Sequence, residues 1–448
     1  MGTMPVGRLL VNMSTPMMLS MMTQALYNIV DSVFVAMINE DALTAVSLAF
    51  PLQMLMVAFG VGTGVGVSAL VSRYLGAREF ERANAIATEG VRLMVLTYVF
   101  FSIFIYGISG PFFQFQTEDE TILSYSLTYM RIIAALSIGM FNQVMLEKLL
   151  QATGKTALSM ITQIVGAVIN MIMDPILIFG YFCFPKMGIA GAAIATIFGQ
   201  IVGGMLAIYF NLAKNGEIKI SLKKYSPNME NIKHIYEIGV PSIIMQAIGS
   251  VMTFGFNKIL MAFSSTATAV FGVYFKLQSF VFMPIFGLNN GMMPIVAYNF
   301  GAKKPSRIMR TFKLSTIAAL VMMAVGTVLF WTIPDKLLML FSASENMLSI
   351  GVPALRIISI HFMLAGFSIV CSSFFQALGH GFLSMINSII RQLGVLLPAA
   401  YILSRIGGLS AVWWAFPIAE LFAVTMCAFF LRRVYRENII PLKKIAEG

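Results

Sequence analysis

Twelve long apolar runs constrain the fold of this 448-residue chain more than any other feature of its sequence. Charged breaks, or breaks rich in glycine and proline, separate one run from the next. A membrane-spanning helix needs about 20 apolar residues, and each run is long enough to supply one. The sequence therefore predicts an all-α polytopic membrane protein with twelve transmembrane helices. The runs lie at residues 11–38, 44–72, 85–110, 122–146, 156–182, 187–212, 233–262, 267–298, 310–334, 347–377, 382–406 and 409–433.

The composition agrees with residence in a lipid bilayer. Hydrophobic residues make up 58% of the chain and charged residues 11%, whereas soluble domains have about 45–50% and about 25%. These values exclude an ordinary soluble enzyme, a nucleic-acid-binding module and a disordered chain. No phosphate loop, dinucleotide fingerprint, nucleophile elbow or metal motif occurs, so we expect neither enzymatic activity nor a cofactor. The three cysteines, Cys183, Cys371 and Cys427, have no metal or redox spacing and are expected to be small buried hydrophobes.

The distribution of basic residues predicts the orientation of the chain in the membrane. Every second connection, together with the two tails, carries 21 lysines and arginines, and the opposite connections carry only Lys186, Lys336 and Arg405. Cytoplasmic loops are enriched in basic residues. Both termini are therefore expected in the cytoplasm.

The second half of the chain repeats the first. Adding 225 to the residue number maps Gly76-Ala77-Arg78 onto Gly301-Ala302-Lys303, and Gln151-Ala152 onto Gln376-Ala377. Six spans per half give both halves the same orientation, an arrangement found in transporters with a central cavity. We predict a six-helix lobe at 1–213, a cytoplasmic linker at 214–232, a second six-helix lobe at 233–435 and a cytoplasmic tail at 436–448.

Two acids in the first lobe are candidates for binding a coupling ion. Asp31 and Asp174 lie in apolar spans, where a charge is costly and points to function. Residue counting places Asp31, Asp174 and Thr196 at similar depths, ~10–14 Å from the outer end of their spans. Asn170 precedes Asp174 by one turn, and Pro175 frees the carbonyl of Met171. Such an all-oxygen set suits Na⁺ or H⁺. The alternative is that the two acids only hold helices together through hydrogen bonds.

A polar stripe on the first span leads to Asp31. Gln24, Tyr27, Asn28 and Asp31 follow the spacing i, i+3, i+4, i+7 and share one helix face. We expect Gln24, Tyr27 and Asn28 to line a substrate cavity, with ordinary helix packing as the alternative.

The second lobe carries different charges. The repeat places Phe256 and Ala399 where the first lobe has Asp31 and Asp174. Lys276, Arg391 and Glu420 lie near the middle of their spans. We predict an ion pair between Arg391 and Glu420, with Lys276 joining it or facing the cavity. A structural role for the pair is the first interpretation, and a role in substrate binding or coupling is the alternative.

These features together resemble the multidrug and toxic compound extrusion (MATE) family of efflux transporters. The resemblance covers nearly all of the chain and implies two six-helix lobes that exchange organic cations for Na⁺ or H⁺. It also implies a cation site at Asp31, Asn170, Asp174 and Thr196. Another branch of the family carries acids in its seventh and tenth helices; here the tenth run has no acid, and the acid of the seventh run, Glu237, lies near the cytoplasmic start of that run. The resemblance is carried by Tyr27-Asn-Ile-Val-Asp31, Tyr74-Leu-Gly-Ala-Arg78, Gln151-Ala-Thr-Gly154, Asn170-Met-Ile-Met-Asp174-Pro175, Gly191-Ala-Ala-Ile-Ala-Thr196 and Tyr298-Asn-Phe-Gly-Ala302.

The expected protein is therefore a secondary active multidrug antiporter that exports amphipathic organic cations in exchange for Na⁺ or H⁺. We expect a monomer in the cytoplasmic (inner) membrane of a prokaryote, with the bilayer and cationic small molecules as its partners. A flippase for a lipid-linked saccharide, from the same broad superfamily, is the alternative. Lys276 and Arg391 favour the flippase because a pyrophosphate needs bases, and Asp31 and Asp174 favour the antiporter.

Overall fold

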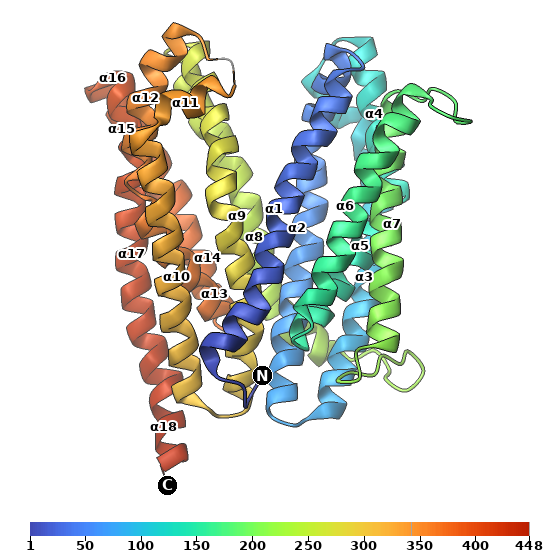
Figure 1. Cartoon of the computed structure of the whole chain (residues 1–448), viewed down its shortest axis with the longest axis vertical. Helices are drawn as coiled ribbons and strands as arrows, with labels where there is room; N and C mark the ends of the chain where they lie inside the picture. The colour runs from blue at the N-terminus through green and yellow to red at the C-terminus, as the bar shows by residue number, and fades with distance from the viewer. Residues whose placement is uncertain (342, 448) are drawn as a thin grey trace. The chain divides into compact units, whose positions relative to one another are not determined.

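The computed structural model describes residues 1–341 and 343–447, and every regular element in these ranges is a helix (Figure 1). The chain divides into two compact units. Unit 1 comprises Met1–Met18 and Ile244–Gly448, and unit 2 comprises Leu19–Ile243. The predicted lobe boundaries at residues 213 and 233 stay a prediction.

Unit 2 contains most of the helices of the first half of the chain. These are most of α1 (Val6–Ala36), then α2 (Glu40–Gly76), α3 (Phe80–Gln116), α4 (Glu120–Ala135), α5 (Ile138–Ala152), α6 (Thr156–Phe179), α7 (Ile189–Ala213) and the start of α8 (Met229–Met261).

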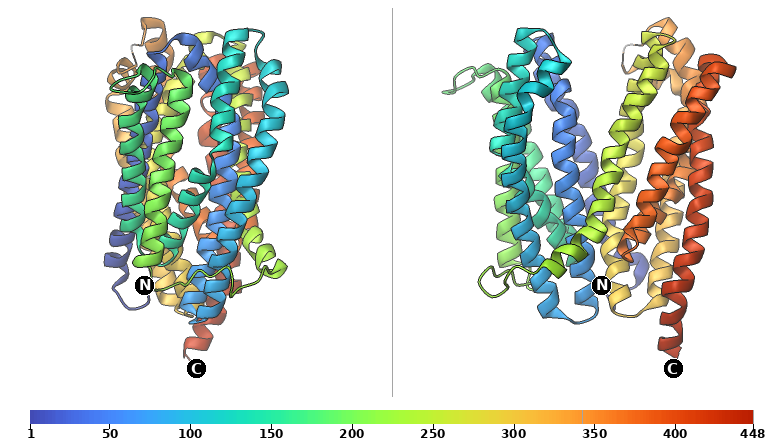
Figure 2. Two further views of the ribbon diagram at one scale, coloured as in Figure 1. Left: turned by 90° about the vertical axis from the view of Figure 1, so that its right-hand side faces the viewer. Right: turned by 180° about the vertical axis from the view of Figure 1, so that it is seen from behind.

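Unit 1 contains the start of α1 and the helices of the second half. These are the rest of α8, then α9 (Ser265–Gly301), α10 (Pro305–Thr332), α11 (Pro334–Met339), α12 (Glu345–Ser359), α13 (Phe362–Ala377), α14 (Gly381–Ile389), the π-helix η1 (Ile390–Leu396), α15 (Leu397–Ile406), α16 (Gly408–Val412), α17 (Ala415–Val434), the π-helix η2 (Tyr435–Ile439) and α18 (Ile440–Glu447). Figure 2 shows α17 running on into the C-terminal helix.

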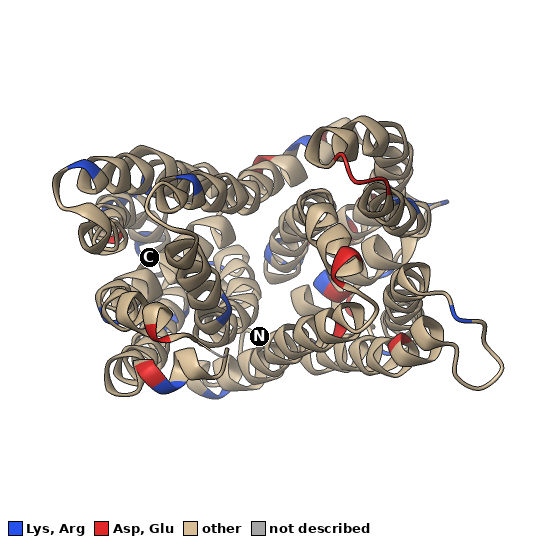
Figure 3. Ribbon diagram, turned by 90° about the horizontal axis from the view of Figure 1, so that it is seen from above, with Lys and Arg blue, Asp and Glu red and all other residues tan. Residues whose placement is uncertain are grey.

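Eleven of the twelve predicted spans correspond to helical segments of membrane-spanning length and apolarity among the described residues. Within the described residues, nine helical segments are long and apolar enough to cross a membrane, and two bent helix pairs raise the number to eleven. The pairs are α4 with α5, bent by 49°, and α12 with α13, bent by 48°. The remaining predicted span, 11–38, corresponds to α1, whose 31 residues extend about 46 Å but include the polar stripe. Viewed from above, few positions on the ribbon are charged (Figure 3).

The cysteines follow the helices, with one exception. Cys371 and Cys427 are buried, as expected, and all three cysteines are free thiols. The expectation of burial is wrong for Cys183, which is exposed. Cys183 lies in the connection between α6 and α7, one residue beyond the predicted run 156–182.

Repeat-related glycines let helices approach closely within each unit. In unit 2, a Cβ at Gly66 would lie 2.2 Å from the carbonyl oxygen of Ile235, at the start of α8. In unit 1, a Cβ at Gly291 would lie 2.4 Å from the hydroxyl oxygen of Ser14, on α1. Gly291 is the repeat equivalent of Gly66. Any side chain at either position would force the helix backbones apart.

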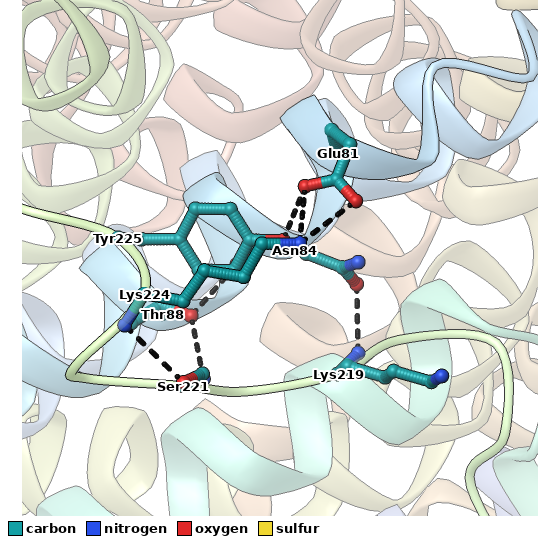
Figure 4. A network of polar contacts seen from close by, with 7 residues as sticks. All are labelled: Glu81, Asn84, Thr88, Lys219, Ser221, Lys224 and Tyr225. Carbon is teal, nitrogen blue, oxygen red and sulfur yellow. Dashed lines mark hydrogen bonds and ion pairs between the residues drawn. The ribbon is translucent and has the colours of Figure 1, made fainter.

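The segment between α7 and α8 docks on the first turns of α3 (Figure 4). The backbone N–H of Lys219 donates to Asn84 Oδ1 at 2.7 Å, and that of Ser221 donates to Thr88 Oγ1 at 3.2 Å. Lys224 Nζ lies 2.9 Å from Glu81 Oε2. Hydrogen bonds to Glu81 and Tyr225 raise the pKa of Lys224, so this lysine stays charged near neutral pH. The predicted linker is therefore docked on α3 through hydrogen bonds and an ion pair.

Removing one of these hydrogen bonds should make the linker between α7 and α8 more accessible to protease. Asn84→Ala deletes the acceptor of the Lys219 N–H, and a hydrogen bond of this kind contributes about 1 kcal/mol. We expect trypsin to cut after Lys219, Lys223 or Lys224 about fivefold faster than in the wild type, because cleavage follows the population of the open form. Thr97→Ala is the control, since Thr97 Oγ1 bonds only the carbonyl of Leu93 on the same helix. Equal cleavage rates for Asn84→Ala and the wild type would show that the hydrogen bond from Lys219 to Asn84 does not hold the linker in place.

Candidate functional site

Three helices of unit 2 bring the predicted oxygen-bearing residues together. Asp31 lies on α1, Asn170 and Asp174 on α6, and Thr196 on α7. The exposed fraction is 0% for Asp174, 2% for Asn170 and 7% for Thr196, whereas Asp31 is half-buried. Three of the four polar residues are therefore removed from solvent, and Asp31 provides the more accessible side of the group.

The carboxyl groups of Asp31 and Asp174 lie close enough to act on each other directly. When the Asn170 amide is oriented to satisfy both of its ends, its nitrogen donates to Asp174 Oδ2 at 3.2 Å. Its oxygen then accepts from the backbone N–H of Thr196 at 3.0 Å. Asn170 thus links the acid on α6 to the backbone of α7.

Close packing of α6 against α7 explains this link. A Cβ at Gly199 would lie 2.5 Å from the carbonyl oxygen of Gly166 and 3.0 Å from the Cβ of Asn170. A Cβ at Gly191 would lie 2.5 Å from the carbonyl oxygen of Leu177. These glycines let the two backbones nearly touch, which leaves Asn170 beside Thr196.

The carboxyl pair is suited to hold one small cation. Two acids this close in a low-dielectric setting resist joint ionisation, so a proton or a metal cation on the pair lowers its electrostatic energy. One oxygen of each acid, Asp31 Oδ1 and Asp174 Oδ1, is buried without a hydrogen-bond partner in the described part of the chain. Neither acid forms an ion pair with a described lysine or arginine. The pair therefore has acceptor capacity left for an ion.

Sequence reasoning missed two residues of this site. Tyr129 on α4 is 3% exposed and lies close enough to Asp31 and Asp174 to interact with both electrostatically. Gln53 on α2 donates from Nε2 to Tyr129 Oη at 3.3 Å. A weak signal existed for Gln53, because the repeat relates it to Gln278. Tyr129 had none, since a tyrosine in an apolar run has an ordinary place in packing.

The predicted stripe on α1 divides in two. Tyr27 is half-buried and lies near both carboxylates, so it belongs with the acid pair. Gln24 and Asn28 are exposed. Their role in substrate binding stays a prediction.

In unit 1, two of the three predicted charges meet. Arg391 Nη1 lies 3.1 Å from Glu420 Oε2, and the side chains are 24% and 4% exposed. Lys276 does not join them: it is exposed, and its ammonium lies 5.7 Å from the centre of the Phe341 ring. Among the described residues it forms no ion pair. The long lysine side chain reaches the surface of the unit instead of the buried pair.

A second buried acid of unit 2 also went unrecognised. Glu147 on α5 is 4% exposed and accepts hydrogen bonds from Gln143, Thr162 and Gln163 at 3.0, 2.8 and 2.7 Å. Lys148 beside it is 8% exposed, although the sequence analysis counted it among the loop residues. The helix α5 extends past the predicted end of its span, and this extension buries both residues.

Comparison with known proteins decides the family. A family model described as MatE matches residues 16–176 and 241–402. The repeat offset maps the start of the first stretch onto the start of the second, and together the two cover most of the chain. The chain belongs to the MatE family. The resemblance inferred from the sequence motifs is thus confirmed, and so is the twelve-helix, two-lobed fold class that it implied.

Curated relatives in this family extend over the whole chain. The "Multidrug export protein MepA" of Staphylococcus haemolyticus is 26% identical over 95% of this chain and 92% of its own length. The protein of the same name from Staphylococcus aureus (strain MSSA476) is 26% identical over 99% of this chain and 97% of its own.

Solved structures in the family have the same fold. An "outward-facing conformation of a multidrug resistance MATE family transporter of the MOP superfamily" aligns with a TM-score of 0.91 and 26% identity, covering 97% of this chain and 96% of that one. A MOP superfamily transporter from Pyrococcus furiosus, described as having a binding pocket of reverse polarity, aligns with a TM-score of 0.91 and 25% identity. That alignment covers 98% of this chain and 97% of the other.

Proposed function

We propose that the chain is a secondary active exporter that moves amphipathic organic cations out of the cell in exchange for Na⁺ or H⁺. The observation that carries this proposal is the contact between Asp31 and Asp174 inside unit 2, with an unpartnered oxygen on each acid among the described residues. An embedded pair of acids without a basic partner is costly in a membrane unless it binds a cation.

Coupling requires only that the ion and the drug favour different states of the protein or exclude each other. The half-buried side of the pair is formed by Asp31 on α1, and the exposed Gln24 and Asn28 lie on the same helix. A cationic drug near this stripe is attracted by the ionised acids, and a proton or Na⁺ on the acids removes that attraction. External Na⁺ or H⁺ therefore promotes release.

The names of the relatives support multidrug export. Proteins named multidrug export protein cover nearly the whole chain. The chain has 34 methionines and 37 phenylalanines, and soft, polarisable and aromatic surfaces accept cations of many shapes. We extend multidrug export, and a location in the cell membrane, to this chain on these grounds.

The flippase alternative loses part of its support in unit 1. Of the two bases that favoured it, Arg391 is paired with Glu420, so its charge is already offset. Of these two bases, Lys276 is the one whose charge is not offset by a described acid and is available for a pyrophosphate.

Drug susceptibility of cells that express the chain separates the two functions. We expect the minimal inhibitory concentration of cationic dyes and quaternary ammonium biocides to rise several-fold, with no change for anionic compounds of similar size. Cells that express Asp31→Asn and Asp174→Asn together are the control for expression of an inactive chain. Resistance to no cation would overturn the antiporter proposal and favour the flippase.

Both termini are proposed to lie in the cytoplasm. A cysteine introduced at position 40 should react with a membrane-impermeant maleimide from outside intact cells, and one at position 304 should react only after the cells are opened. Cys183 is exposed and must first be replaced by serine. Labelling of position 304 but not position 40 in intact cells would reverse the proposed orientation.

A further inference from the structure

The region of unit 1 that corresponds to the acid site is aromatic. Phe256 stands at the repeat position of Asp31. For the last helix, Gly188 and Gly408, which both have positive φ, anchor a local alignment that adds 220 to the residue number. The same alignment pairs Gly191, Gly199 and Gly203 with Ala411, Ala419 and Ala423. Phe416 then corresponds to Thr196, and the rings of Phe256 and Phe416 lie 5.0 Å apart.

The charges of unit 1 lie one helical turn away from this aromatic contact. Glu420 follows Phe416 by four positions, and Arg391 precedes Val395, the repeat equivalent of Asn170, by four. In unit 2 the positions that correspond to Glu420 and Arg391 are Gln200 and Gly166. Unit 1 thus has its own charged centre, on the helices equivalent to α6 and α7 but at a different level from the acids of unit 2.

The Glu420 carboxylate is only partly satisfied. Glu420 Oε2 accepts from Arg391 Nη1 at 3.1 Å, whereas Glu420 Oε1 is buried without a partner among the described residues. The hydroxyl of Tyr274, on a side chain that is 0% exposed, is likewise buried without a partner in that part of the chain. A purely structural ion pair would be expected to satisfy both carboxylate oxygens.

Three groups interact electrostatically with the Glu420 carboxylate. They are Arg391, Tyr274 on α9, and His361 at the bend between α12 and α13. His361 is 4% exposed, and its ring contacts that of Phe416 with centroids 5.7 Å apart. Its Nδ1 lies within hydrogen-bonding distance of the carbonyl oxygen of Ile358, which orients the imidazole.

Arg391 lies in an irregular segment of its helix. This segment is the π-helix η1, directly before the turn that contains Pro398. A π-helical turn holds one residue more than an α-helical turn, and such turns are frequent at functional sites. Glu420 lies on the regular helix α17.

We propose that Glu420 is a proton-binding residue of unit 1, separate from the acid pair of unit 2. While Arg391 is paired with it, the carboxylate is ionised. When the pair opens, Glu420 takes a proton from a hydronium ion, which is left as water; an O–H bond forms on the carboxylate, and the guanidinium keeps its charge. Tyr274 and His361 lie close enough to share the electrostatic field of this carboxylate. This inference goes beyond the proposed function, and its test needs no transport.

Infrared difference spectroscopy of the purified chain tests the proposal. The background is Asp31→Asn with Asp174→Asn, which removes the titration of the unit 2 pair. We expect a carbonyl band of a protonated carboxylic acid to appear as the pH is lowered, and Glu420→Gln in the same background to remove an amplitude equal to one proton per chain. Glu147 and the surface acids contribute equally to both spectra and cancel. Identical spectra with and without Glu420→Gln would overturn the proposal and leave a structural ion pair.

Two further variants keep the test decisive if Glu420→Gln folds poorly. Glu420→Asp keeps an acid that can pair with Arg391, so its band should move in frequency rather than disappear. Arg391→Met removes the cation, so Glu420 should already be protonated at neutral pH and its band should no longer change with pH. An unshifted band in Glu420→Asp, or a Glu420 carboxylate that stays ionised in Arg391→Met, contradicts the inference.

Discussion

Replacing Asp174 with Asn is expected to reduce ion-driven efflux to the background of cells without the protein. The substitution keeps the shape of the side chain and the contact with Asn170 but removes the charge that holds the coupling ion. Asp31→Asn should have the same effect, because a cation between two acids needs both of them. The amount of protein in the membrane should stay within a factor of about two, since removing one of two crowded acids relieves their mutual repulsion.

Dye efflux from cells, normalised to the amount of protein in the membrane, measures this effect. Asp335→Asn is the matched control, because Asp335 is exposed on α11 in unit 1 and undergoes the same chemical change. Its efflux should equal that of the wild type. Normal efflux by both Asp31→Asn and Asp174→Asn would remove the acid pair from the mechanism.

Glu420→Gln is expected to lower the amount of folded protein. The substitution leaves Arg391 without its partner in an apolar setting, and breaking a buried ion pair from one side typically costs about 3–5 kcal/mol. Arg391→Met combined with Glu420→Met should recover much of the loss, because no charge is then left unpaired. The monodisperse fraction after solubilisation and the unfolding temperature measure both effects.

An exposed ion pair in the same unit provides the control. Arg433 Nε lies 2.8 Å from Glu437 Oε1, with side chains 57% and 48% exposed, so Glu437→Gln should change stability very little. If Glu420→Gln is as abundant as Glu437→Gln and fully active, the buried pair contributes no stability. If the double methionine variant is abundant but does not transport, the pair also serves transport.

Much of the fold could be predicted because the spans and the internal repeat each follow from residue patterns along the sequence. Apolar runs mark the helices, and the repeat offset recurs in the two MatE matches. The helix ends were less predictable. Predicted spans such as 85–110 fall short of α3, Phe80–Gln116, because the helix begins in the polar residues at 80–84 and continues through Pro111.

The bends could not be predicted. The break between α4 and α5 lies at Leu136-Ser137, without a proline, and the equivalent break between α12 and α13 lies at Ile360-His361. Hydropathy reads the same for a straight and for a broken helix. The bend places His361 near Glu420, and sequence patterns could not assign this histidine its neighbours.

Site residues with a charge could be predicted from the sequence, because burying a charge in an apolar span costs free energy. Site residues with an uncharged polar group could not. Asp31 and Asp174 stand out because a carboxylate in an apolar run needs a reason. Tyr129 does not, since its ring packs like phenylalanine and only its hydroxyl reveals a polar role. For Lys276, residue counting left two outcomes open, because it gives depth along a helix but not the direction of the side chain, which depends on the neighbouring helices. The structure excludes contact with the Arg391–Glu420 pair, and a position facing the cavity stays a prediction.

Transport by the purified chain in proteoliposomes tests the central claim most directly. Uptake of a cationic dye is followed while a Na⁺ gradient or a pH gradient is imposed separately, for the wild type and for Asp174→Asn. We predict that at least one gradient drives dye uptake by the wild type, that a dye gradient drives the same ion in the opposite direction, and that Asp174→Asn does neither. Dye movement that depends on neither gradient, or gradient-driven uptake that persists in Asp174→Asn, would contradict the account.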